Sequence, residues 1–150
     1  MNETEERFLQ RAIDLAAAGR AAGGGPFGSL LVDSQGTVLA EDYNTVKADH
    51  DISAHPEFKL AKWASVNLAP QTAASVTMYT SCQPCAMCSG AIDRSGLGRV
   101  VYALSNQQFA QLFPHTSFPP IRDRAPIGSR NSVGPRPGHV GDGAYGLRQR

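Results

Sequence analysis

Two short segments of this 150-residue chain constrain its fold most, because together they supply the ligands of one metal ion. His55-Pro56-Glu57 and Pro84-Cys85-Ala86-Met87-Cys88 are separated by 26 residues and offer one imidazole, two thiols and one carboxylate. An imidazole with two thiolates suits a tetrahedral zinc ion, and three protein ligands leave a fourth position open to water, as catalytic sites require. The fold must therefore bring the two segments together.

Both segments are predicted to begin helices. Cys85 and Cys88 are three positions apart, so one helix face presents both sulfur atoms to a common point. They would lie in the first turn of that helix, where the positive end of the helix dipole favours thiolates. Pro56 suits the first turn of a helix beginning at His55, because the missing N–H of proline costs nothing there. We therefore predict that two helix N-termini converge on the metal.

Glu57 is predicted to be the catalytic acid/base, with His55, Cys85 and Cys88 as the zinc ligands. Glu57 lies two positions after His55 and does not share its helix face, so it is better placed to exchange protons with water than to bind the metal. A structural zinc site is the alternative, with Cys82 as a possible fourth ligand. We expect Cys82 to be a buried thiol instead, since a structural site would leave Glu57 without a purpose.

The rest of the chain alternates between helical and strand patterns. Asn2 and Glu5 can form a capping box, and a stripe of apolar residues follows on one helical face: Phe8, Leu9, Ala12, Ile13 and Ala16. Alternating strands and helices predict an α/β fold with three layers, helices on both faces of a sheet. The predicted helices cover residues 2–19, 54–68, 85–95 and 106–113, and the predicted strands cover residues 27–32, 37–43, 75–80 and 99–105.

The composition changes from Pro114 onward. The last 37 residues contain six prolines, six glycines and six arginines, with no sustained apolar periodicity. We therefore divide the chain into a folded domain, residues 1–113, and a Gly/Pro/Arg-rich C-terminal segment, residues 114–150. The segment is predicted to be poorly ordered; the alternative is that it wraps a partner subunit or closes the site.

Overall composition excludes several classes of protein. With 41% apolar residues, 18% charged residues and a net charge of +1, the chain fits a globular domain without a general attraction to nucleic acid or anionic lipid. No apolar run approaches the length of a membrane span, and the acidic N-terminus does not have the order of a signal peptide. Three cysteines within seven positions make a poor disulfide framework. We expect a soluble, cytoplasmic protein with no membrane partner.

Over roughly residues 5–113 the motifs resemble those of the cytidine deaminase-like superfamily. Thr80–Ile92, which reads TSCQPCAMCSGAI, is similar to the bacterial guanine deaminase and cytosine deaminase branch, and so is Pro26-Phe27-Gly28. The resemblance implies an α/β/α sandwich around a mixed sheet of about five strands. It also implies one zinc ion per chain, hydrolytic deamination and a homodimer.

The resemblance also implies which residues contact the substrate. Asn44 would hydrogen-bond the substrate ring, the backbone from Ala54 to Glu57 would line its edge, and Phe27 and Pro84 would be further contacts. The alternative for Asn44 is a turn residue after a strand. The chain departs from the family at Pro56, where a small residue is usual.

The predicted activity is release of ammonia from an exocyclic amine of a free nucleobase, nucleoside or related aminoheterocycle, guanine- or cytosine-like. Guanine deaminases carry an Asp in the stretch that is Asn106-Gln107-Gln108 here, which argues against guanine specifically. One alternative is a tRNA adenosine deaminase, which needs a basic groove. Residues 1–120 hold 8 basic and 11 acidic residues, so we expect no nucleic-acid partner. A non-catalytic zinc-binding protein is the second alternative.

Overall fold

The computed structural model describes residues 2–114, and the structural statements below concern these residues. All the predicted helices and strands are present, shifted by a few residues at their ends. Two helices of four residues each, α2 and α4, were not predicted. In chain order the elements are α1 (Glu3–Ala21), β1 (Gly28–Val32), β2 (Val38–Tyr43), α2 (Val46–Asp49), α3 (Pro56–Asn67), α4 (Pro70–Ala73), β3 (Thr77–Cys82), α5 (Ala86–Ser95), β4 (Arg99–Leu104) and α6 (Asn106–Leu112).

The sheet is mixed, with strand order β2-β1-β3-β4. Strand β1 runs antiparallel to β2 and to β3, whereas β3 and β4 are parallel. The mixed α/β sheet is confirmed, with four strands between residues 2 and 114 against the expected number of about five. The expectations for the segment 114–150, apart from Pro114 itself, lie outside the described residues.

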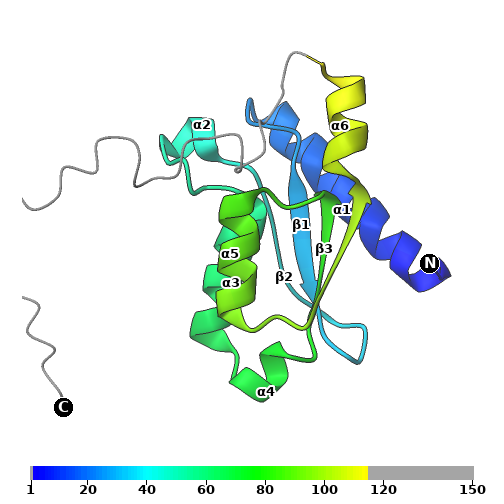
Figure 1. Cartoon of the computed structure of the whole chain (residues 1–150), viewed down its shortest axis with the longest axis vertical. Coiled ribbons are helices and arrows are strands. Elements are labelled where there is room, and N and C mark those ends of the chain that lie inside the picture. Colours follow the sequence, from blue (N-terminus) through cyan, green and yellow to red (C-terminus); the bar gives the residue numbers. More distant parts are fainter. Residues whose placement is uncertain (1, 115–150) are drawn as a thin grey trace, which may run out of the picture. The chain divides into compact units, whose positions relative to one another are not determined.

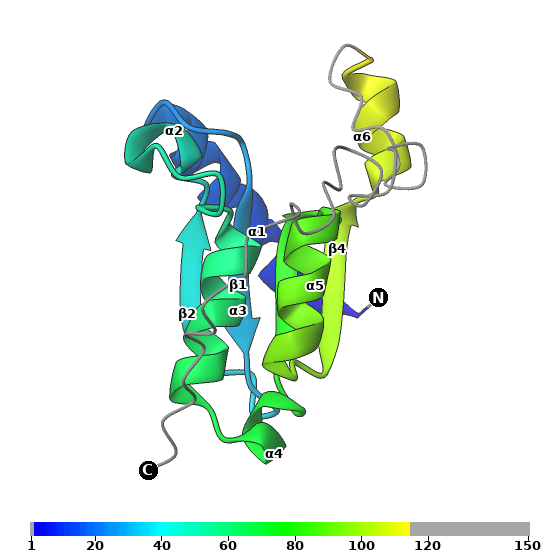
Figure 2. The same ribbon diagram turned by 60° about the vertical axis from the view of Figure 1, so that its left-hand side comes forward.

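Helices cover both faces of the sheet, which confirms the three-layer fold (Figures 1 and 2). Helix α1 packs on one face, and α3 and α5 lie side by side on the other. The side chains of β1 alternate between the two layers: Leu30 and Val32 pack with α1, and Leu31 packs with α3 and α5. All five residues of β1 are buried, as expected of a strand that helices cover on both faces.

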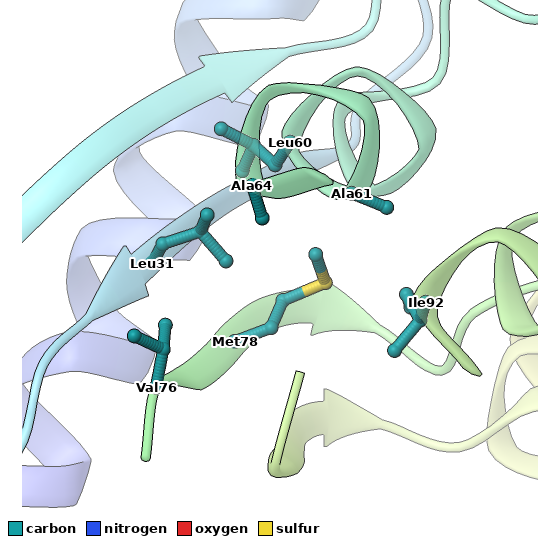
Figure 3. Close-up of a cluster of buried hydrophobic side chains, with 7 residues drawn as sticks. All are labelled: Leu31, Leu60, Ala61, Ala64, Val76, Met78 and Ile92. Atoms are coloured by element: carbon teal, nitrogen blue, oxygen red, sulfur yellow. The ribbon is translucent and has the colours of Figure 1, made fainter. Parts of the chain in front are cut away.

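A cluster of apolar side chains fixes α3 and α5 against the sheet (Figure 3). Two of its members on α3 are alanines, Ala61 and Ala64, which allow the helix to approach the strands closely. Met78, the second residue of β3, is fully buried. Because the two helices are held by one cluster, their N-terminal ends are held relative to each other. The cluster consists of Leu31, Leu60, Ala61, Ala64, Val76, Met78 and Ile92.

Helix α1 begins as predicted. Asn2 Oδ1 accepts a hydrogen bond from the Glu5 amide at 2.9 Å, and Glu5 Oε2 accepts one from the Asn2 amide at 3.2 Å. The predicted apolar stripe was wrong at Ile13, which is 43% exposed. The buried face centres on Ala12, and Ile13 lies one step around the helix from it. Within the described part of the chain, no helix is long and apolar enough to cross a bilayer.

Candidate metal centre and active site

The metal-ligand candidates stand at the starts of α3 and α5. His55 is the N-cap of α3 with extended backbone (φ −76°, ψ 140°), and buried Pro56 occupies the first helical turn. Cys85 is the N-cap of α5 (φ −68°, ψ 170°), and Cys88 lies in the first turn of that helix. Both helix N-termini therefore reach the same place, as the sequence pattern predicts.

The three side chains form a group of suitable size for one zinc ion. His55 Nδ1 lies 3.6 Å from Cys88 Sγ and 3.8 Å from Cys85 Sγ. The three ligand atoms all lie within 4.8 Å of one another. With Zn–N near 2.0–2.1 Å and Zn–S about 2.3 Å, a tetrahedral site separates nitrogen from sulfur by about 3.6 Å. The observed spacing therefore fits zinc with little rearrangement.

Glu57 lies beside this group and is buried, with 4% of its surface exposed. Its Oε2 is 3.9 Å from Cys88 Sγ, and its Oε1 accepts a hydrogen bond from Thr80 Oγ1 at 3.1 Å. Burial raises the pKa of the Glu57 carboxyl above its ordinary value, and the bond from Thr80 offsets part of that rise. A raised pKa suits a carboxyl group that both takes up and releases a proton near neutral pH.

A chain of hydroxyl groups behind Glu57 was missed by sequence reasoning. Ser29 Oγ donates to Thr80 Oγ1 at 2.8 Å, and Thr80 bonds Glu57 in turn. Ser29 and Thr80 are fully buried and face each other in the β1–β3 register. The sequence does show hydroxyl residues inside two apolar strand patterns, Ser29 and Thr80 among them. Whether their side chains meet depends on the register of the two strands. The sequence alone does not give that register.

The thiols of the candidate site differ in protonation when no metal is bound. Hydrogen bonds from Cys88 and His55 lower the pKa of Cys85 to about 3. The same bond with Cys85, together with burial, raises the pKa of Cys88, and the bond with Cys85 raises the pKa of His55. Zinc binding would therefore displace a proton from Cys88.

Cys82 lies outside the group of candidate ligands. It is the last residue of β3, as expected for a residue on the strand side of the motif, and it is 7% exposed. Burial raises the pKa of its thiol to about 11. These properties agree with a buried thiol and not with a fourth zinc ligand.

Asn44 directly follows β2 and is buried. Hydrogen bonds hold its backbone amide and its side-chain oxygen. Its amide N–H donates to the Phe27 carbonyl at 2.9 Å, and its Oδ1 accepts from the Val46 amide at 3.2 Å. Because Oδ1 is engaged, the side-chain NH₂ group is the part of Asn44 left to donate to a ligand. The next amide, Thr45 N–H, donates to the Ala54 carbonyl at 3.1 Å and so joins this segment to the start of α3.

Phe27 and Pro84 are the two other side chains expected to contact the substrate; Phe27 directly precedes β1. The Phe27 ring lies 5.9 Å, centroid to centroid, from that of Phe109 on α6. A Cβ at Gly25 would come within 3.1 Å of the Phe27 ring and 3.3 Å of Asn44 Cγ, so this close approach favours glycine. Pro84 is partly buried and immediately precedes the N-cap of α5.

Comparison with known proteins identifies the family of this chain. Residues 2–104 match the family model described as the cytidine and deoxycytidylate deaminase zinc-binding region. The chain therefore belongs to this deaminase family, whose domain binds zinc. Among the described residues, His55, Cys85 and Cys88 form a group that could hold the zinc ion.

Curated relatives include base deaminases. The chain is 39% identical to guanine deaminase of Bacillus subtilis over 107 residues, which are 71% of this chain and 68% of that enzyme. It is 36% identical to the probable cytosine deaminase of Schizosaccharomyces pombe over 115 residues, 75% of this chain and 67% of that protein. A tRNA-specific adenosine deaminase of Haemophilus influenzae is 30% identical over 105 residues, 70% of this chain and 61% of that protein.

Solved structures lead to the same family. The crystal structure of the B. subtilis guanine deaminase superposes with a TM-score of 0.64 at 38% sequence identity. The match covers 75% of this chain and 71% of that one. The cytidine deaminase-like fold expected from the motifs is thereby confirmed.

Proposed function

We propose that residues 1–113 form a zinc-dependent hydrolytic deaminase acting on a free nucleobase, nucleoside or related aminoheterocycle. The reaction replaces an exocyclic amine with a carbonyl group: the ring unit H₂N–C=N and water give O=C–NH and ammonia. The observation that carries this proposal is the placement of buried Glu57 against three metal-ligand side chains that share one centre. A structural zinc site would not need a buried carboxyl group at that place.

The proposed ligands of the zinc ion are His55, Cys85 and Cys88. When bound, such a zinc ion supplies Lewis acidity, which lowers the pKa of a water molecule toward about 7. The two helix N-termini add the positive ends of their dipoles to the same place. These dipoles favour the thiolate forms that the metal requires.

Glu57 is proposed to move the protons of the reaction. Thr80 holds Oε1, so Oε2 is the oxygen that faces the ligand group and is available for proton transfer. Glu57 would accept a proton from the attacking water and pass it to a ring nitrogen. It would then take the remaining proton of the added hydroxyl group and deliver it to the departing amine, which leaves as ammonia. General acid/base catalysis of this kind contributes about 10²–10⁴-fold to the rate.

Asn44 is proposed to orient the substrate ring through its side-chain NH₂ group, which would donate to a ring nitrogen or carbonyl oxygen. The Val46 amide supports this assignment, because it fixes the amide oxygen and therefore the direction of the nitrogen. Phe27, the backbone at Ala54, and Pro84 are the further proposed substrate contacts.

The charge of the described region favours a small substrate over tRNA. Residues 1–114 hold 8 basic and 11 acidic residues, a difference of −3. A tRNA deaminase must anchor phosphates while it extrudes the target base. A net acidic body provides little of that anchoring. The guanine and cytosine deaminases among the relatives act on bases and agree with the small-substrate assignment.

The test is ammonia release from a panel of aminopurines, aminopyrimidines, pterins and triazines by the full-length chain loaded with zinc. We expect turnover of at least one member, with guanine and cytosine included in the panel. Inosine formation in tRNA without turnover of any small molecule would instead establish the tRNA deaminase alternative. Silence in both assays by protein with stoichiometric zinc would establish a non-catalytic zinc protein.

We also propose a homodimer and a cytoplasmic location, as the family resemblance and the composition imply. Sedimentation equilibrium of the zinc-loaded chain tests the first proposal, with a dimer mass expected. Fractionation of the producing cells tests the second.

A further inference from the structure

Lys59, on α3, contacts three residues that lie close to Asn44 in the sequence. Its ammonium group donates to the Tyr43 carbonyl at 2.8 Å and to Thr45 Oγ1 at 3.1 Å. The same nitrogen lies 2.8 Å from Asp42 Oδ1. An ammonium group has three N–H donors, so each of them has a partner in the segment that carries Asn44.

We propose that Lys59 is a positioning residue that holds Asn44 at a fixed place relative to the start of α3. The inference rests on the proposed function, because it takes Asn44 to be a substrate contact. Tyr43 and Thr45 are the two chain neighbours of Asn44, and Lys59 bonds both. Lys59 also follows His55 by one helical turn on α3, so it connects the proposed substrate-binding segment to the helix that presents His55 and Glu57.

A simple surface ion pair would not have this geometry. The side chains of Lys59 and Asp42 are 27% and 35% exposed, and a partly exposed pair of this kind contributes little stability by itself. The other two bonds go to a backbone carbonyl and a hydroxyl group, whose positions define the path of the chain. Thr45 Oγ1 in turn donates to Asp49 Oδ2 at 2.6 Å, which extends the link to α2.

The contacts of Lys59 predict an effect on substrate binding and not on proton transfer. Lys59 lies two positions after Glu57 and therefore points away from it around α3. Its partners belong to the Asn44 segment and not to the group of His55, Cys85 and Cys88. Loss of Lys59 should therefore raise KM while leaving zinc content and kcat nearly unchanged.

The test compares Lys59→Met with Lys62→Met, a matched control at an exposed position of the same helix. On the best substrate of the panel we expect Lys59→Met to raise KM about tenfold, the effect of losing one hydrogen bond from Asn44 to the substrate. In the Asn44→Ala background the same change should move KM less than about twofold, since coupled residues are not additive. An equal rise in both backgrounds would overturn the proposal.

A measurement without substrate separates this inference from the proposed function. In the zinc-loaded full chain, hydrogen exchange at the Thr45 and Val46 amides should become about tenfold faster in Lys59→Met and stay unchanged in Lys62→Met. Unchanged exchange in Lys59→Met would refute the positioning by Lys59, whatever the activity. Absence of ammonia release by the unaltered chain would refute only the proposed function.

A second variant removes the hydrogen bond between Lys59 and Thr45 by changing Thr45. Thr45→Val removes the hydroxyl acceptor of Lys59 but keeps the Thr45 N–H bond to Ala54. It should raise KM and speed exchange at Val46 in the same direction as Lys59→Met. If Lys59→Met does not fold, Thr45→Val decides: unchanged KM and exchange in that variant would contradict the proposal.

Discussion

The hydroxyl group of Thr80 lies 3.1 Å from Oε1 of Glu57, and this bond gives the two carboxylate oxygens different surroundings. Oε1 is held inside the sheet layer, while Oε2 lies 3.9 Å from Cys88 Sγ at the candidate metal centre. Ser29 donates to Thr80 and leaves the single Thr80 proton for its own acceptors, of which Glu57 is the nearest at 3.1 Å. The carboxyl group of Glu57 is thereby oriented by two buried hydroxyl groups that are not among the proposed zinc ligands.

Replacement of Thr80 by Val should lower kcat about tenfold, because a buried carboxylate oxygen loses a bond worth about 1–3 kcal/mol. Zinc content should stay unchanged, since Thr80 contacts none of the three proposed ligands. Thr80→Ser keeps the hydroxyl group and is expected to recover most of kcat. Steady-state kinetics at confirmed zinc loading provide the measurement. Equal kcat in Thr80→Val and the unaltered chain would show that the hydroxyl only fills the core.

Loss of a metal ligand should cost both zinc and stability. His55→Ala and Cys88→Ala are expected to fall from about one zinc per chain to nearly none after dialysis, because two ligands bind far more weakly than three. Thermal unfolding of these variants, and of the unaltered chain treated with a chelator, should shift to lower temperature. Stoichiometric zinc in either variant would mean that the ligand set is different.

Cys82→Ala is the matched control for the cysteine ligands and should retain full zinc. With the pKa of its thiol raised to about 11, about one Cys82 in a thousand is ionised at pH 8. Cys82 should therefore react slowly with a thiol reagent in the folded chain, and faster only as the pH rises toward that pKa. Zinc loss in Cys82→Ala would place Cys82 in the metal site, whereas rapid modification at pH 8 would contradict the burial of its thiol.

Gly28 and Gly90 provide a test of the packing between α1 and the sheet. A Cβ at Gly28 would lie 2.5 Å from the Ala12 carbonyl oxygen and from the Ala16 amide nitrogen, whereas nothing lies within 4 Å of one at Gly90. Gly28→Ala should therefore lower the free energy of unfolding by about 1–3 kcal/mol. Gly90→Ala, in the exposed part of a helix, should raise it by up to about 1 kcal/mol. Denaturant titration distinguishes the two, and equal stabilities would contradict this packing.

Local patterns were sufficient to predict most of the fold. The capping box at Asn2 and the motif around Cys85 defined helix starts. Helix α5 ends at Ser95, as predicted, and Gly96 caps it with φ of 76°. The short helices α2 and α4 have only four residues, too few to produce a periodic pattern. The error at Ile13 arose because several apolar residues on α1 fit a stripe, and only packing decides which of them is buried.

The sequence was sufficient to predict the candidate metal ligands, because the spacing of two of them along one helix is visible in it. Cys85 and Cys88 share a helix start, and the structure brings His55 to them as the motif implies. The residues that orient this site were not predictable, because they depend on long-range pairing. Ser29 reaches Thr80 only through the register of β1 and β3, and Lys59 reaches the Asn44 segment only when α3 packs beside β2.

The most direct measurement is zinc content and ammonia release in the Glu57→Ala variant of the full-length chain. Glu57 is proposed to transfer protons without binding the metal, so the variant should keep about one zinc per chain while its kcat falls by about 10²–10⁴-fold. Loss of zinc would make Glu57 a ligand. Undiminished turnover at full zinc would remove it from the chemistry, and either result would contradict the proposed active site.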